Sequence, residues 1–356
     1  MVAHKPCCAV AVFDIAVHQT LGDANDGPME QEAIRVPILM NRRRHLLALG
    51  ASVVGILGGS SAQGSPNPPI RQRDLPLSHQ WVTPKIDGPG LSFHTFFSQA
   101  LGTQVSFHVY TPSAYIADPA RRFPVVYWLH GSGGGVSGIS RLSALADAAI
   151  AARQVPPFLI VFVNGLQMGM YVDWANGKAP LETIIVHELR PHIDANWRTI
   201  ATREGRLLDG FSMGGYGAGR FGLRYPELFQ NVSMMGAGPM QETLERTPRA
   251  SKMQAIDLLR NVYGGGQDRF RAVSPRRYAE QNAAILANSS RLRLVIGDQD
   301  ETFENNRDFH NHLARLGIPH EWIVLPGIGH DPMGVITALG DQHWAFYREA
   351  FAARRV

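Results

Sequence analysis

The sequence predicts an α/β fold, with a mostly parallel central sheet and helices on both faces. Two observations carry this prediction. From about residue 80 onward, short apolar runs rich in β-branched and aromatic residues alternate with longer segments of helical character. Several of the apolar runs stop abruptly at glycine-containing loops, as buried strands do before a connecting helix.

The expected strands are short and apolar, as strands buried on both faces are. They occupy residues 106–110, 123–129, 158–163, 206–209, 291–296 and 321–325. The expected helices are 140–153, 181–193, 213–225, 301–316 and 341–353. Residues 239–290 fit the alternation least well, and we expect them to form a small insertion.

Composition is that of an ordinary globular protein. Of the 356 residues, 45% are hydrophobic and 18% charged, which is enough apolar material for a sizeable core. The net charge of +4 comes from 34 Lys and Arg against 30 Asp and Glu. Such a small excess gives no electrostatic case for a nucleic-acid partner. The only cysteines, Cys7 and Cys8, precede the expected domain, so disulfide and cysteine chemistry is excluded from it.

The N-terminal region has the pattern of an export signal. Residues 1–39 show no sustained period and are interpreted as an extension upstream of the true start at Met40. In residues 40–62, a basic stretch around Arg43 and Arg44 precedes an apolar run and small residues. The run is too short to span a bilayer, and the paired arginines resemble a twin-arginine signal. Residues 63–79 are a proline-rich linker, and 80–356 the domain, which we expect to be periplasmic or secreted.

A nucleophile motif stands at Gly210–Phe211–Ser212–Met213–Gly214, the only G-x-S-x-G in the chain. An expected strand precedes it and a helix rich in small residues follows. That context suits a serine on a sharp, strained strand-to-helix turn, with its hydroxyl projecting into a cleft. The flanking glycines make room where a Cβ would meet the neighbouring strand or helix. We therefore expect Ser212 to be a catalytic nucleophile.

An acid and a histidine follow the nucleophile in the order that such a triad requires. His330 comes after the last expected strand, and Asp298 and Asp300 come after the strand before it. His330 would take the Ser212 proton, while the acid would fix the histidine tautomer. Asp300 is preferred as the acid because it lies one step further out past Gly297. Asp298 is the alternative acid; if it does not have that role, we interpret it as a turn residue.

Oxyanion stabilisation needs preorganised N–H donors. Met213, directly after the nucleophile, supplies one, and Ser132 in the glycine-rich loop after residue 129 is expected to supply the other. No G-x-x-x-x-G-K-[ST] pattern is present, which argues against a nucleotide cradle. His310 and His312 are spaced to face different ways on a helix, so we interpret them as solvent-exposed. His187, His192 and His343 are left to structural roles.

With these residues in place, the chain resembles the esterase family of α/β hydrolases that includes feruloyl and acetylxylan esterases, esterase D and mycolyltransferases. The resemblance runs from about residue 90 to the C-terminus. Its segments are 123–131, 171–174, 187–189 with 193–194, 210–215, 297–300 and 317–321 leading to His330. It implies the α/β-hydrolase fold, Asp300 as the acid, and His130, Gly131, Tyr171 and Trp174 beside the substrate.

These observations together predict an exported serine carboxylesterase that works through an acyl-enzyme on Ser212. The expected substrates are acyl or feruloyl esters, as small molecules or linked to polysaccharide. No metal or organic cofactor and no nucleic-acid partner is implied. An acyltransferase of the same fold is the alternative within enzymes. A non-catalytic carbohydrate- or protein-binding module is the alternative from another class, and loss of a triad residue would be its mark.

Overall fold

The computed structural model describes residues 79–245 and 247–352. Their centre is an eight-stranded sheet with strand order β1-β2-β4-β3-β5-β6-β7-β8. The strands are β1 (Leu91–Ser98), β2 (Thr103–Tyr110), β3 (Val125–Leu129), β4 (Leu159–Val163), β5 (Arg206–Phe211), β6 (Asn231–Met235), β7 (Arg291–Gly297) and β8 (Glu321–Leu325). The expected signal segment and nearly all of the linker lie outside the described residues.

The sheet is mostly parallel. Only β1 with β2 and β2 with β4 pair antiparallel; the strands from β4 to β8 run parallel to their neighbours. The carboxyl ends of those parallel strands therefore meet at one edge of the sheet, where ligands bind in open α/β sheets. The predicted fold class is confirmed.

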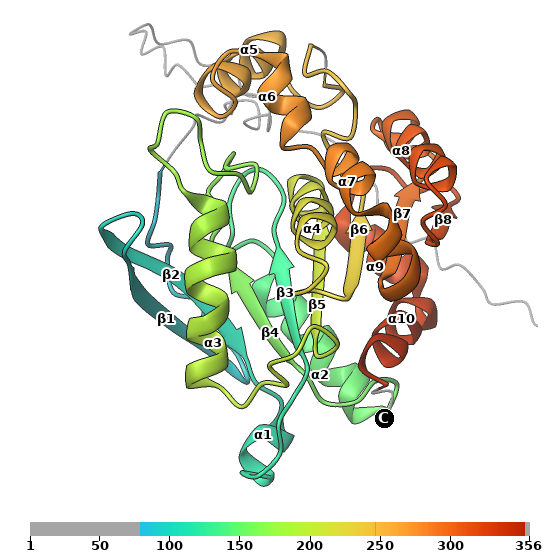
Figure 1. The fold of residues 1–356 in the computed structure, drawn as a ribbon. Coiled ribbons are helices and arrows are strands. Elements are labelled where there is room, and N and C mark those ends of the chain that lie inside the picture. Colours follow the sequence, from blue (N-terminus) through green and yellow to red (C-terminus); the bar gives the residue numbers. More distant parts are fainter. Residues whose placement is uncertain (1–78, 246, 353–356) are drawn as a thin grey trace, which may run out of the picture. The chain divides into compact units, whose positions relative to one another are not determined.

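Helices cover both faces of the sheet (Figure 1). One face carries η2 (Thr183–Leu189), α3 (Arg190–Asn196), α4 (Met213–Arg224), α7 (Pro275–Ser289) and α8 (Phe303–Arg315). The other carries α2 (Ile139–Ala151), α9 (Pro332–Leu339) and α10 (Asp341–Phe351). Alternate residues of β3 serve the two cores: Val125, Tyr127 and Leu129 pack on the first face, and Val126 and Trp128 on the second.

Most expected elements are present within a few residues of their predicted bounds. Outside residues 239–290, four elements were missed: β1, α1 (Ser113–Ala117), β6 and α9. Residues 91–94 and 97 of β1 are only partly buried or exposed, so its apolar signal is weak at this sheet edge. β6 is five residues long and includes Asn231 and Ser233, which are buried only because the neighbouring strands supply polar partners.

Residues 239–290 divide between two places. α5 (Lys252–Asn261) and α6 (Gln267–Ala272) lie beyond one end of the sheet in Figure 1. In contrast, α7 packs on α4, and its Tyr278, Ala279 and Leu286 belong to the main core. The expected insertion thus ends before α7, because that helix has an apolar face which the sheet layer buries.

The segment expected as one helix over 181–193 is a π-helical turn, η2, followed by the short α3. Pro191 near the start of α3 has no N–H to donate to the preceding turn, which favours a change of helix type there. A separate short helix, α1 (Ser113–Ala117), connects β2 to β3. Among the residues that the structure describes, no helix is both long enough and apolar enough to cross a membrane.

Candidate active site

Ser212 occupies the turn between β5 and α4, at the carboxyl edge of the sheet. Its backbone has φ 60° and ψ −121°, a conformation that a non-glycine residue rarely adopts. The turn is fixed by hydrogen bonds on both sides. The Ser212 N–H donates to the carbonyl of Met235 at 2.9 Å, and its carbonyl accepts from Tyr216 and Gly238 at 3.0 and 3.1 Å. Strand β6 and helix α4 therefore hold the strained residue in place.

The two glycines of the motif are required by close backbone approach. A Cβ on Gly214 would lie 1.8 Å from the carbonyl oxygen of Leu129, at the end of β3. A Cβ on Gly210 would lie 2.5 Å from the backbone of Gly214. Neither neighbour is a flexible side-chain end, so no other residue type fits. This is the physical basis of the G-x-S-x-G pattern in this chain.

His330 and Asp300 come together from the loops after β8 and β7. Nδ1 of His330 lies 2.6 Å from Oδ2 of Asp300, and both side chains are buried. Oδ1 of Asp300 accepts from the N–H and the hydroxyl of Thr302, each at 2.8 Å. Burial alone would raise the pKa of Asp300, but its hydrogen bond to His330 and those from Thr302 hold the pKa below its usual value. Asp300 is therefore ionised at neutral pH.

Asp298, the alternative acid, is engaged elsewhere. Its Oδ1 accepts from the N–H of Gly327 at 2.7 Å, which joins the loops after β7 and β8. The structure thus brings Asp300, and not Asp298, to His330. The Asp298 carboxylate instead contacts the turn at Gly327.

The second ring nitrogen of His330 is available for proton transfer. Nε2 is buried and has no hydrogen-bond partner among the described residues. The ring packs on Phe211, the residue before Ser212, with centroids 4.6 Å apart. No hydrogen bond joins Ser212 to His330 in this arrangement. Catalytic hydrogen bonds are often long before substrate is bound and tighten in the complex.

Ser212 opens into a cavity of about 70 Å³. The two residues expected at the oxyanion site, Ser132 and Met213, line the same cavity. Apolar side chains form most of the remaining wall; they include Met168, Met170, Pro239, Leu244 and Leu258. An apolar cavity with a few convergent polar groups is typical of a small-molecule site.

His130, Tyr171 and Trp174, which the family resemblance placed beside the substrate, are not among the described residues that line this cavity. All three are buried and hold loops instead. Trp174 Nε1 donates to the carbonyl of Gly169 at 3.0 Å, and the Tyr171 hydroxyl donates to the carbonyl of His130 at 2.9 Å. Their polar atoms are engaged by backbone groups, so their direct effect is on loop position.

Both ring nitrogens of His130 bond to backbone. Nε2 accepts from the N–H of Gly165 at 2.9 Å, so Nδ1, 2.7 Å from the carbonyl of Gly131, carries the proton. Burial lowers the pKa of His130 to about 4. The ring is therefore neutral and connects the loop after β3 to the loop after β4. Gly131, beside it, does lie against the site: a Cβ there would be 3.3 Å from that of Ser212.

Sequence reasoning missed the walls of the cavity. Met168 and Met170 belong to the loop after β4. The sequence could have indicated their place in the site only by their position, since that loop leaves the carboxyl edge of the sheet. Leu244 and Leu258 belong to the 239–290 segment, whose irregular pattern did not show which side chains face Ser212. These residues come from two separate stretches of chain, so only the tertiary structure brings them together.

The remaining histidines are only partly as expected. His310 and His312 do face different ways on α8, but the expectation that they are solvent-exposed is wrong, because both are half-buried. His310 Nδ1 lies 2.7 Å from Nε2 of His320 and its ring stacks on Trp322, whereas His312 Nε2 lies 3.3 Å from the carbonyl of Arg276. Burial lowers the pKa of both rings.

One group of side chains among the described residues has the composition of a metal site. Atoms of Asp300, Glu301 and His330 lie within 4.8 Å of one another. Each already has a protein partner: Asp300 and His330 bond to each other, and Glu301 accepts from Arg249 at 2.7 Å. The geometry is that of a histidine oriented by a carboxylate.

Comparison with known proteins identifies the family. The family model described as "Putative esterase" matches residues 98–355, so the chain belongs to this esterase family, a class of carboxylic ester hydrolases. An esterase of Mycobacterium tuberculosis (strain H37Rv) is 29% identical over 259 residues, covering 68% of this chain and 56% of that protein. The chain thus spans about half the length of that relative.

Two further similarities concern feruloyl esterases. An endo-1,4-beta-xylanase/feruloyl esterase of Xylanibacter ruminicola is 29% identical over 167 residues, which are 44% of this chain and 23% of that protein. The solved structure of a ferulic acid esterase is 26% identical, with a TM-score of 0.63 over 73% of this chain and 98% of its own. An S-formylglutathione hydrolase from Agrobacterium tumefaciens, 18% identical with a TM-score of 0.59 over 75% and 98%, shares the α/β-hydrolase fold.

From the low pKa of His130 we predict how the free energy of unfolding depends on pH. The unfolded chain binds a proton at this ring below about pH 6.5, whereas the folded chain binds it only below about pH 4. The free energy of unfolding must therefore fall as the pH is lowered through this window. A fall in pKa from 6.5 to about 4 corresponds to on the order of 3 kcal/mol. In His130→Gln this contribution is absent, so urea denaturation at about pH 7 and about pH 4.5 will show a smaller pH dependence than in wild type. Equal pH dependence in the two proteins would contradict the assignment.

Proposed function

We propose that this protein is a serine carboxylesterase that forms an acyl-enzyme on Ser212. The observation that carries the proposal is the strained Ser212 turn, which opens into an apolar cavity beside a buried His330–Asp300 pair. Membership of the esterase family supports it independently.

In the proposed reaction, Oγ of Ser212 attacks the ester carbonyl carbon while its proton passes to Nε2 of His330. The N–H groups of Met213 and Ser132 stabilise the oxyanion that forms. The bond to the alcohol oxygen then breaks, and the alcohol leaves with the proton from His330. Water attacks the acyl-enzyme in the same way, giving its proton to His330, and Oγ of Ser212 recovers that proton as the acid is released. Asp300 keeps the proton of the neutral ring on Nδ1 and stabilises the imidazolium.

Acyl and feruloyl esters are the proposed substrates, either as small molecules or on polysaccharide. The apolar cavity wall supports an acyl group as its occupant. Two of the similar proteins are named as feruloyl or ferulic acid esterases. That similarity supports the substrate class, while acyl size depends on the walls of the cavity.

We also propose that the protein is exported. The support is the basic, apolar and small-residue succession in residues 40–62, which lie outside the described residues. Expression of the full chain in a bacterial host, followed by N-terminal sequencing of the exported protein, will show a new terminus shortly after residue 62. Export of protein that still begins at residue 1, or retention of all of it in the cytoplasm, would refute the proposal.

Loss of the nucleophile is the direct test of the reaction. We expect purified wild type to hydrolyse p-nitrophenyl acetate, butyrate or octanoate, or methyl ferulate. Ser212→Ala should lose on the order of 10³-fold or more in kcat, since no acyl-enzyme can form. Circular dichroism spectra that match those of wild type serve as the control for folding. A Ser212→Ala variant as active as wild type would exclude this serine as the nucleophile.

The two aspartates provide a matched pair for the acid. Asp300→Asn should lower kcat about 10³- to 10⁴-fold, because an amide cannot hold His330 in the required tautomer. Asp298→Asn changes a carboxylate in the same loop but leaves the His330 contact intact, so its kcat should stay within about tenfold of wild type. Comparison of kcat for p-nitrophenyl acetate decides the matter, and the reverse ranking would assign the acid role to Asp298.

A further inference from the structure

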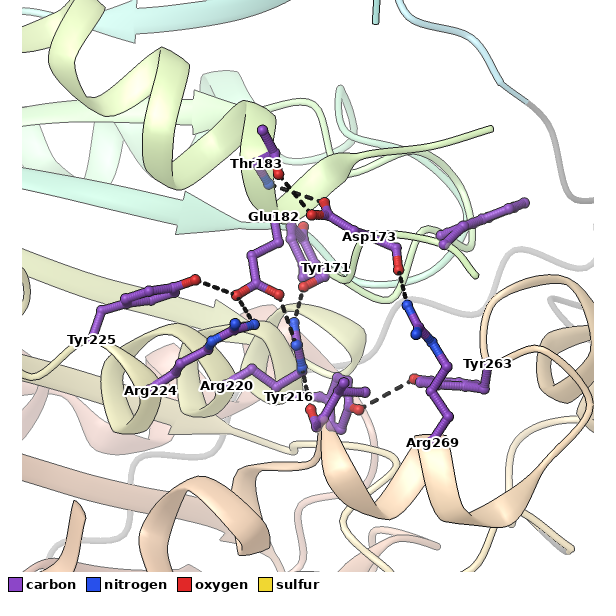
Figure 2. A network of polar contacts seen from close by, with 12 residues as sticks. Tyr171, Asp173, Glu182, Thr183, Tyr216, Arg220, Arg224, Tyr225, Tyr263 and Arg269 are labelled. Carbon is purple, nitrogen blue, oxygen red and sulfur yellow. Dashed lines mark hydrogen bonds and ion pairs between the residues drawn. The ribbon is translucent and has the colours of Figure 1, made fainter. Parts of the chain in front are cut away.

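A buried guanidinium joins three separate parts of the site (Figure 2). Arg220 lies on α4, two turns after Ser212, and its side chain is 1% exposed. Its Nε donates to the carbonyl of Val273 at 2.5 Å, Nη1 to the carbonyl of Tyr171, and Nη2 to Oε2 of Glu182 at 2.9 Å. All three nitrogens are thus bonded, each to a different stretch of chain.

Glu182, the counter-charge, is fully engaged. Its Oε1 accepts from Nη1 of Arg224 at 2.5 Å and from the Tyr225 hydroxyl at 2.7 Å. Burial by itself would raise the pKa of Glu182, but the charge of Arg220 and the bonds from Tyr225 and Arg220 bring the pKa below its usual value. The carboxylate is therefore ionised at neutral pH. A buried ion pair adds little net stability, because the cost of removing both charges from water offsets their attraction. Its main effect is to hold the Arg220 side chain in one position.

The loop that Arg220 contacts has unusual backbone strain. Leu166, Met170 and Tyr171 have φ of 56°, 57° and 52°, and none of them is a glycine. Such conformations persist only where surrounding contacts determine them. The Tyr171 carbonyl is held by Arg220, and its hydroxyl is held by the His130 carbonyl. This loop presents Met168 and Met170 to the cavity beside Ser212.

Arg220 also contacts the stretch of chain that forms the second wall of the cavity. Val273, which accepts from Nε of Arg220, follows α6 at the end of the stretch that also contributes Leu244 and Leu258 to the cavity. Figure 2 shows two additional ties between this stretch and the rest of the domain. The hydroxyls of Tyr216 and Tyr263 lie 3.2 Å apart, and Nη2 of Arg269 donates to the carbonyl of Asp173 at 3.3 Å.

The cavity between these two walls is small and is open to solvent on one side. Its volume of about 70 Å³ compares with roughly 150 Å³ for an engineered apolar cavity that binds benzene. A compact acyl group such as acetyl fits between the walls, whereas a larger acyl group, feruloyl included, must extend through the open side of the cavity or move the walls apart. We infer that Arg220 is a positioning residue that holds both walls of the cavity and thereby selects compact acyl groups over larger ones. This inference rests on the proposed function and specifies its substrate class.

The test compares esters that differ only in acyl length. For p-nitrophenyl octanoate and acetate, the ratio of kcat/KM is measured in wild type and in Arg220→Met with Glu182→Gln. The second change removes the charge of a buried carboxylate that would have lost one of its two cationic partners, a loss that would threaten folding. We expect the octanoate-to-acetate ratio to rise about tenfold, the size of effect that added space in an apolar pocket produces. Hydrogen exchange of the amides of residues 165–175 should become faster in the same variant.

Two further variants make the result specific. Arg224→Met removes the other cation that pairs with Glu182, on the same helix, but leaves both walls tied; its ratio should stay within about twofold of wild type. Tyr171→Phe removes only the hydroxyl that holds the strained loop. It should raise the ratio in the same direction by a smaller factor, and it serves as the test if the double variant does not fold.

The outcomes are distinct. If wild type is active and the octanoate-to-acetate ratio is unchanged in folded Arg220→Met/Glu182→Gln, the inference is overturned and the proposed function stands. If the double variant does not fold, an unchanged ratio in Tyr171→Phe has the same meaning. Unchanged amide exchange at residues 165–175 also overturns it, and this measurement does not depend on catalysis. Wild type that hydrolyses none of the esters refutes the proposed function itself.

Discussion

The close approach of helix α4 to the end of β3 is the constraint on which the rest of the site depends. Gly214 meets the carbonyl of Leu129 at a distance that no side chain allows, and Gly210 meets Gly214 in the same way. This contact forces the chain through a sharp turn at Ser212 and leaves its backbone strained. Because the turn is rigid, the hydroxyl is directed without help from a mobile loop. The hydrogen bond from Ser212 to Met235 carries the same constraint to β6.

Two buried arginines connect the elements around this turn to other parts of the domain. Arg220 extends from α4 to the carbonyl groups of Tyr171 and Val273, which belong to the two stretches that form the cavity walls. Arg293 on β7 lies 3.8 Å from Asp209 of β5, and both side chains are fully buried. It also donates from Nε to Ser233 at 2.8 Å, while the Tyr347 hydroxyl donates to Asp209 at 2.6 Å. Strands β5, β6 and β7 and helix α10 are thereby joined three residues before Ser212.

Much of the fold and part of the site could be predicted from local pattern. Short apolar runs gave most of the strands, because strands buried on both faces need continuous apolar sequence. The rule that functional groups gather at strand carboxyl ends placed Ser212, Asp300 and His330 near one another, and the structure has the last two in contact. The family resemblance, in contrast, placed His130, Tyr171 and Trp174 beside the substrate, and the structure buries all three side chains. They belong to the loops after β3 and β4, and the polar atoms of their side chains bond to the backbone of those two loops.

By itself, the sequence determined the α/β class, the G-x-S-x-G turn at Ser212 and the order in which the aspartates and His330 follow it. These are local properties, set by apolar period, glycine spacing and position after a strand. Only the tertiary structure decided which aspartate meets His330, which side chains enclose the cavity, and where Arg220 points. Those outcomes depend on contacts between residues far apart in the chain, such as Glu182 with Arg220 and Met170 with Leu258 across one cavity. No local pattern encodes such a contact, because each of the two residues could pack against many other neighbours. The folded sheet brings these two together.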